Sequence, residues 1–261
     1  MLILTYLPGF ITAVVHSMPG VWKGQHRLIL CWLIMMQAVY PGRKTWHELA
    51  RWSPRQITEW RLRRLLSASY WSIHLLIEWL AYEVIAQLPP PADGILYGIG
   101  DSSHKPKRAK QNPIAQKGRN AKHKDWFFGI RFALLIVVWD VYRLPVAFRI
   151  ILPKTHRDYR KENALFREML KQFQPPSWAQ QVIVEGDAAY GAKANIELVK
   201  RLDKLDACRN WNFVFAISRS WKTPDNQSVK DLVTHLPRHD YQRKVDPRHD
   251  LDTEPIRLAL P

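Results

Sequence analysis

Two aspartates, Asp101 and Asp187, have the residue type and the setting that metal-dependent phosphoryl transfer requires. Each follows a short apolar run, residues 95–99 and residues 182–184, so each is predicted to lie just past the C-terminal end of a strand. Ligands of open α/β sheets gather outside those strand ends. Carboxylate oxygens suit Mg²⁺, and two such ions can activate an attacking oxygen and stabilise a leaving one. The competing interpretation is that each Asp only forms a turn.

The elements that must position these aspartates indicate a mixed α/β sheet. The predicted order is strand, strand, strand, helix, strand, helix, strand, and this alternation is typical of a mixed sheet flanked by helices. Asp140 is predicted to form the tight turn of a hairpin. The predicted strands cover residues 95–99, 126–139, 141–152, 181–185 and 213–217, and the predicted helices cover residues 161–173 and 192–205.

Residues 1–88 are predicted to form an all-helical N-terminal domain, which ends at the prolines 89–91. Thr45 and Glu48 have the spacing of a capping box, and a second short helix is predicted to start at Ser53. Two short helices with a basic second member are compatible with a helix-turn-helix reader of DNA, and a plain helical bundle is the alternative. The basic residues of that second helix are Arg61, Arg63 and Arg64. The tryptophans of this domain are predicted to be mostly core residues: Trp46, Trp52, Trp60, Trp71 and Trp79.

A strongly basic loop is predicted to join the strand before Asp101 to the next strand. Because this loop is predicted to lie beside the metal site, we expect it to neutralise DNA phosphates next to the scissile bond of a DNA substrate. The alternative is a solvated loop without a partner. Its basic residues are Lys105, Lys107, Arg108, Lys110, Lys117, Arg119, Lys122 and Lys124.

The composition agrees with a polyanionic partner. The 261 residues carry a formal net charge of +16, and 47% of them are hydrophobic, which is typical of a globular basic protein. The two cysteines, Cys31 and Cys208, have no metal-ligand spacing and fit a reducing cytoplasm. The apolar runs near the N-terminus are too short to span a bilayer, so no membrane partner is expected.

The motifs around both aspartates resemble those of DDE-class transposases of bacterial insertion sequences. The stretch Gly100-Asp101-Ser102-Ser103 resembles the first catalytic motif, and the stretch from Val182 to Gly191 resembles the second, with an aromatic-Gly pair after the Asp. The resemblance covers residues 94–221 and is nearest to the IS-four group. It implies an RNase H-like fold, and it implies Mg²⁺-dependent cleavage at the terminal repeats of a mobile element and strand transfer during DNA recombination. It also implies a bacterial, nucleoid-associated protein that binds double-stranded DNA and self-associates on it.

The third carboxylate of such a site has no clear counterpart in the sequence. The family carries it on a helix after the fifth strand, whereas residues 198–253 contain no Glu; Asp225 and Glu254 are weak candidates. Residues 222–261 are therefore interpreted as the start of an insertion in a C-terminally truncated chain. Two hypotheses remain: a DDE transposase that is nearly inactive at this length, and a non-catalytic DNA-binding regulator of transposition.

Overall fold

The computed structural model divides the chain into two compact units, residues 1–215 and residues 216–261. The structure describes residues 8–18, 24–39, 42, 45–53, 57–68, 72–106, 112–119 and 126–216. The sequence also predicts a short helix at residues 229–236, which lie outside these residues. The division of the chain at residue 88 stays a prediction.

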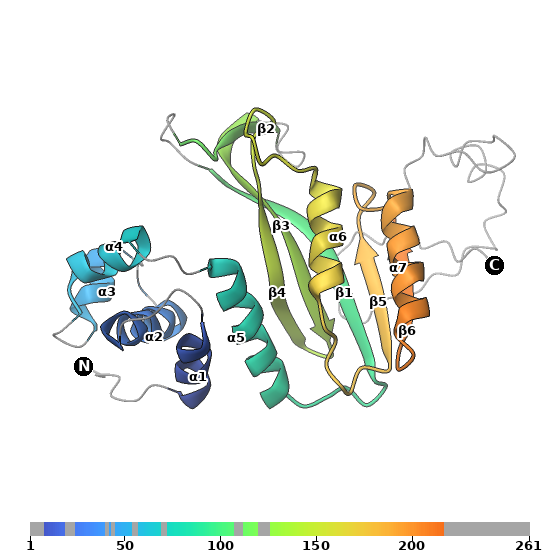
Figure 1. Ribbon diagram of the computed structural model, residues 1–261, viewed down its shortest axis with the longest axis horizontal. Coiled ribbons are helices and arrows are strands. Elements are labelled where there is room, and N and C mark those ends of the chain that lie inside the picture. The colour runs from blue at the N-terminus through green and yellow to red at the C-terminus, as the bar shows by residue number, and fades with distance from the viewer. Residues whose placement is uncertain are drawn as a thin grey trace, which may run out of the picture. The chain divides into compact units, whose positions relative to one another are not determined.

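Helices precede the sheet, as predicted (Figure 1). A buried cluster of hydrophobic side chains from the first four helices and the start of the fifth holds them together. Thr45 caps α3, because its hydroxyl accepts a hydrogen bond from the backbone N–H of Glu48. The five helices are α1 (Gly9–Ser17), α2 (Gly24–Val39), α3 (Trp46–Arg51), α4 (Glu59–Ala68) and α5 (Ile73–Gln87).

One expectation for this region is wrong, and the prediction that its tryptophans are mostly core residues holds only in part. Helix α4 begins at Glu59 rather than at Ser53, and the Thr58 hydroxyl accepts a hydrogen bond from the backbone N–H of Arg61 at its start. Trp60 is 62% exposed and Trp52 is 41% exposed, so neither is a core residue. Trp46 and Trp79 are partly buried against the helical core, and Trp71 lies outside the described residues. Among the described residues, no helix is long and apolar enough to cross a membrane.

The sheet has β1 at its centre. Strand β1 pairs with β3 in antiparallel orientation on one side and with β5 in parallel orientation on the other. Strand β6 continues the parallel side, and β4 and β2 both pair with β3, at different parts of its length. The strands are β1 (Ile95–Pro106), β2 (Gln116–Arg119), β3 (Trp126–Trp139), β4 (Tyr142–Ile151), β5 (Gln181–Gly186) and β6 (Asn210–Phe215).

The predicted hairpin is confirmed. Strands β3 and β4 are joined through Asp140 and Val141, and Asp140 has a φ of 42°. A short polar side chain tolerates this left-handed conformation better than a β-branched one. Both strands are long because they pair over most of their length, with one irregularity after Leu135.

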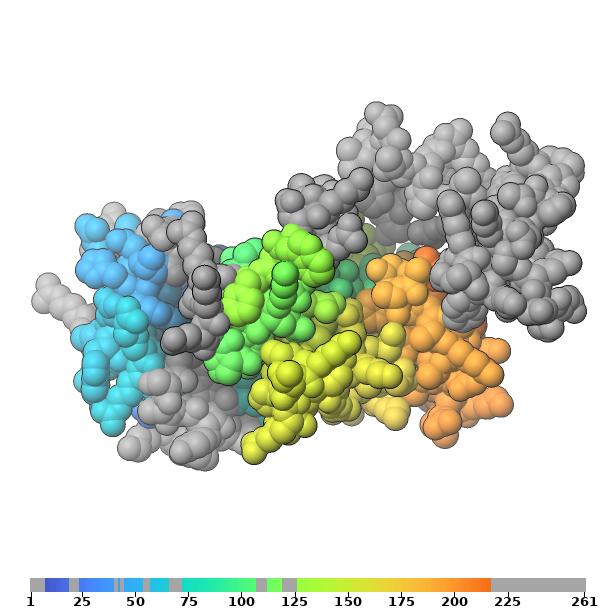
Figure 2. Space-filling model, turned by 90° about the horizontal axis from the view of Figure 1, so that it is seen from above, coloured from blue at the N-terminus to red at the C-terminus, as the bar shows by residue number. Residues whose placement is uncertain are grey.

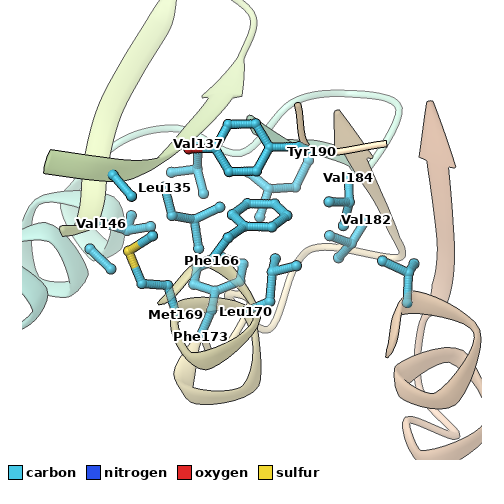
Figure 3. Close-up of a cluster of buried hydrophobic side chains, with 14 of the residues drawn as sticks. Leu135, Val137, Val146, Phe166, Met169, Leu170, Phe173, Val182, Val184 and Tyr190 are labelled. Atoms are coloured by element: carbon cyan, nitrogen blue, oxygen red, sulfur yellow. The ribbon is translucent and has the colours of Figure 1, made fainter. Parts of the chain in front are cut away.

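Helices α6 (Glu162–Gln172) and α7 (Lys193–Leu205) cover one face of the sheet (Figure 1). The spacing of Leu165, Phe166, Met169 and Leu170 places these side chains on one side of α6, and all four are buried. Figure 3 shows Phe166 at the centre of this core, between side chains of β3 and β5 and beside Tyr190. The predicted class, an RNase H-like mixed sheet flanked by helices and preceded by helices, is confirmed.

Alternate residues of each strand point to opposite sides, so the two faces differ in content. The helix-covered face of the central strands carries Leu96, Leu135 and Val182, which are completely buried. The opposite face carries Ile99 and Leu134, which are half-buried, together with Asp101. We call it the Asp101 face.

Candidate active site

The pairing of β1 with β5 brings Asp101 and Asp187 together. The register of these parallel strands runs from Ile95 opposite Gln181 to Gly100 opposite Gly186. Asp101 and Asp187 directly follow this last pair on their two strands, and neighbouring strands lie about 4.8 Å apart. The two aspartates therefore occupy adjacent positions on neighbouring strands, and both are exposed.

The setting of Asp101 differs from the prediction. Strand β1 does not end before it but continues to Pro106, because residues 101–106 pair with β3 as far as Gly129. Much of the predicted basic loop is therefore strand, since β2 also forms within it. Asp101 lies inside β1, and its Oδ1 accepts a hydrogen bond of 2.7 Å from the backbone N–H of Ser102.

Asp187 begins a tight turn directly after β5. Its Oδ1 accepts a hydrogen bond of 2.9 Å from the backbone N–H of Ala189, and its carbonyl accepts hydrogen bonds from the N–H groups of Tyr190 and Gly191. These bonds fix both the turn and the orientation of the carboxylate. One oxygen of each aspartate is thus held by backbone, which limits the rotation of both side chains.

Two glycines precede the aspartates and allow close packing beneath them. A Cβ atom on Gly100 would lie 2.5 Å from the Phe166 ring, and one on Gly186 would lie 2.7 Å from the Cβ of Tyr190. The absence of side chains at these paired positions lets the two aromatic rings pack in edge contact, with centroids 4.7 Å apart. The end of the sheet that carries the aspartates consequently rests on a closely packed aromatic pair.

Tyr190 links the Asp187 turn to the start of α6. Its side chain is buried, and its hydroxyl donates a hydrogen bond of 2.9 Å to Oε1 of Glu162. The other oxygen of Glu162 forms an ion pair of 3.0 Å with Arg131 of β3. Burial raises the pKa of Tyr190, and the negative charges of Glu162, Asp101 and Asp187 raise it further. The phenol therefore stays protonated and remains a hydrogen-bond donor, within the electrostatic reach of both aspartates.

A completely buried asparagine makes a second link. Asn195 of α7 donates hydrogen bonds of 2.7 Å to the carbonyl of Tyr190 and to Oδ1 of Asn163, and it accepts one from Arg167. Asn163 in turn donates to the carbonyl of Ala189. The turn after Asp187 is thus tied to both α6 and α7.

Glu162 and Asn195 were not among the site residues predicted from the sequence. Asn195 had a usable signal, because it lies at helical spacing from Leu198, Val199 and Leu202 and is the one polar residue in that apolar series. A polar residue there requires a buried hydrogen-bonding partner. Glu162 had no such signal, since an acidic residue in the first turn of a helix is ordinary.

The predicted DNA-binding residues are only partly described. Lys105 and Lys117 lie exposed on β1 and β2, and Arg119 ends β2. On α4, Arg63 forms an ion pair with Glu59, and Arg64 lies over the Trp60 ring. Arg61 also lies on α4. The remaining predicted basic residues lie outside the described residues, as do both candidates for a third carboxylate: Lys107, Arg108, Lys110, Lys122, Lys124, Asp225 and Glu254. Within the described residues, no group of three or more His, Cys, Asp or Glu side chains is arranged to hold a metal ion.

Solved structures with similar folds include two transposase complexes. No family model and no curated protein matches the sequence. The piggyBac transposase synaptic complex with hairpin DNA is 11% identical, with 83% of this chain and 48% of that chain covered and a TM-score of 0.41. The Mos1 strand transfer complex is 13% identical, with 83% and 65% covered and a TM-score of 0.24. The chain thus spans about half the length of the piggyBac protein.

Proposed function

We propose that this chain is a DNA transposase that cleaves DNA at the ends of an insertion sequence and joins them to a target, with Asp101 and Asp187 as its catalytic carboxylates. The observation that carries the proposal is their adjacency, since the register of β1 and β5 sets both at one exposed edge. The RNase H-like order of the strands around β1 supports it. The IS-four group remains the proposed family.

The donor atoms at this edge fit Mg²⁺. Both side chains offer carboxylate oxygens, both are exposed to a substrate, and hard oxygen ligands are those that Mg²⁺ prefers. Asp101 and Asp187 would hold the metal, with two ions in a complete site. When bound, Mg²⁺ supplies positive charge against the phosphate and lowers the pKa of a coordinated water.

The chain's own residues would orient the substrate. Asp101 and Asp187 repel a DNA phosphate unless a cation lies between them, which makes productive binding dependent on the metal. The Tyr190–Glu162 and Asn195 hydrogen bonds hold the Asp187 turn in place, so the distance between the carboxylates stays fixed. Lys105 and Lys117 are exposed beyond Asp101 on the same sheet, where they can contact the phosphates of double-stranded DNA.

The test is cleavage of a duplex that carries the element's terminal repeats, with the wild-type chain and with Asp101→Asn and Asp187→Asn. We expect Mg²⁺-dependent cleavage that is weak, because the described residues offer only two carboxylates to the metal, and that each substitution abolishes. Asp140→Asn is the matched control, because Asp140 lies in an exposed turn whose φ of 42° suits Asn. Cleavage that survives both substitutions, or DNA binding without any cleavage, contradicts the proposal; the second outcome indicates a non-catalytic DNA-binding regulator.

A further inference from the structure

Past the start of the β4 pairing, β3 continues with β2 on one side and the last residues of β1 on the other. Strand β4 pairs with β3 only from Arg131 onward, whereas residues 126–129 of β3 pair with β2. On the other side of β3, residues 105–106 of β1 pair with residues 129–130. We call residues 105–106, 116–119 and 126–130 the ribbon. Figure 2 shows its residues, in green, at the surface of the molecule.

Adjacent aromatic residues of the ribbon have opposite surroundings. Phe127 is anchored: its ring stacks on His104 with centroids 4.0 Å apart, and a Cβ on Gly118 would lie 2.4 Å from the same ring. Trp126 is 65% exposed, and Nζ of Lys117 lies 4.8 Å from its ring centroid. The anchored ring fixes the backbone from which the exposed indole projects, so an ordered aromatic surface is offered to solvent.

The strand register places this indole on the Asp101 face. Side chains alternate between the two faces along a strand, so Lys105 lies on the same face of β1 as Asp101, and it is opposite Ile130 of β3. By the same alternation, Phe128 and Trp126 lie on the same face of β3 as Ile130, and Phe128 is opposite Lys117 of β2. Lys105, Lys117 and Trp126 therefore share one face of the sheet with the catalytic carboxylate.

The chemistry of this surface matches a nucleic acid. A cation beside an exposed indole presents a positive charge to phosphate and an aromatic plane to a base, which is how proteins hold unpaired nucleotides. The segments that join the ribbon strands add five more basic residues to the sequence, Lys107, Arg108, Lys110, Lys122 and Lys124. An apolar protein partner would gain nothing from so dense a positive charge.

We propose that Trp126 stacks on an unpaired base of the DNA substrate while Lys117 and Lys105 contact the neighbouring phosphates. The proposal rests on the proposed function for its substrate class and adds that the strand held at the ribbon is locally unpaired. A base within an intact duplex has both faces covered by its neighbours, so stacking on Trp126 requires a single-stranded extension or a displaced base.

The test compares binding of a blunt duplex with binding of the same duplex bearing a single-stranded extension. We expect the wild-type chain to prefer the extended probe. Trp126→Ala should lower that preference about fivefold or more, and Trp126→Phe should retain most of it, because a ring remains for stacking. Trp60→Ala is the matched control, since Trp60 is equally exposed and carries Arg64 at 5.0 Å over its ring; it should leave the preference unchanged.

The dependence of binding on salt separates stacking from charge. Lys117→Ala should lower the slope of log affinity against log salt by about one, whereas Trp126→Ala should leave the slope unchanged. An unchanged preference in Trp126→Ala, or an equal loss in Trp60→Ala, overturns the stacking site while the proposed function stands. Failure of the wild-type chain to bind either probe overturns both.

Discussion

The two faces of the sheet differ in how completely their side chains are buried. On the helix-covered face, Leu96, Leu135 and Val182 are inaccessible to solvent, and the α6 side chains fill the space above them. On the Asp101 face, Ile99 and Leu134 are half-buried, and the face continues to the exposed Trp126. The comparison indicates that one face supplies most of the packing energy, which leaves the other free to carry charged and exposed groups.

Removing the central ring of the helix-covered face tests this difference most strongly. Phe166→Ala should lower the free energy of unfolding by about 3–5 kcal/mol, because the substitution leaves a cavity in a closely packed core. Ile99→Ala, on the Asp101 face, should cost only about 1 kcal/mol, because its side chain is already half-exposed. Urea unfolding of both variants measures the two values. Equal costs would show that the faces contribute alike.

Adding one methyl group distinguishes two glycines of the same strand. Gly100→Ala should cost about 1–3 kcal/mol, since the new Cβ would meet the Phe166 ring at 2.5 Å. Gly98→Ala places its Cβ 3.9 Å from Leu135, an ordinary contact, and should be nearly neutral. Thermal unfolding at constant pH is sufficient to compare them. A neutral Gly100→Ala would mean that α6 does not press against this end of β1.

The dependence of stability on pH provides a smaller test, at the junction of α5 with β4. Burial of His74 against Phe148, and then the charge of Arg149, lower the pKa of His74, while Glu78 and Glu168 oppose that shift. The folded chain therefore binds the His74 proton less tightly than the unfolded chain. The contribution of His74 to the free energy of unfolding is therefore fully present above its unfolded pKa of about 6.5. It is lost as the pH falls toward the lower pKa of His74 in the folded chain.

His74→Phe should remove this part of the pH dependence. The substitution keeps an aromatic ring against Phe148 and eliminates the titrating group, so unfolding free energies measured from about pH 7 down to about pH 5 should vary less than in the wild type. An identical pH profile in the two proteins would assign the effect to other groups.

The sequence predicted the elements that depend on local pattern. Helices α6 and α7 and the β3–β4 hairpin follow from the spacing of apolar residues and from the turn at Asp140, and they form within a few residues of the predicted bounds. The prediction from the sequence failed where pairing with a strand distant in sequence determines the secondary structure. The polar stretch from Ser102 to Lys105 has little preference for strand, and it is extended because β3 pairs along it.

The candidate site likewise contains residues that could be predicted from the local sequence and residues that could not. The aspartates were predicted from their residue type and their positions beside apolar runs, and their adjacency required only that the two strands be neighbours. Glu162 contacts Tyr190 of the Asp187 turn from a helix that precedes β5, whereas Asn195 contacts it from the helix that directly follows the turn. The exposure of Trp126 also depends on the ribbon, which forms only when residues of β1, β2 and β3 pair.

The central claim is that Asp101 and Asp187 act as one site, and the effect of Mg²⁺ on DNA affinity tests it directly. We predict that Mg²⁺ strengthens DNA binding by the wild-type chain. Asp101→Asn and Asp187→Asn should each strengthen binding without metal, because a repelling charge is removed, and each should abolish the Mg²⁺ effect as fully as the double variant does. A Mg²⁺ effect that persists in either single variant would contradict the claim.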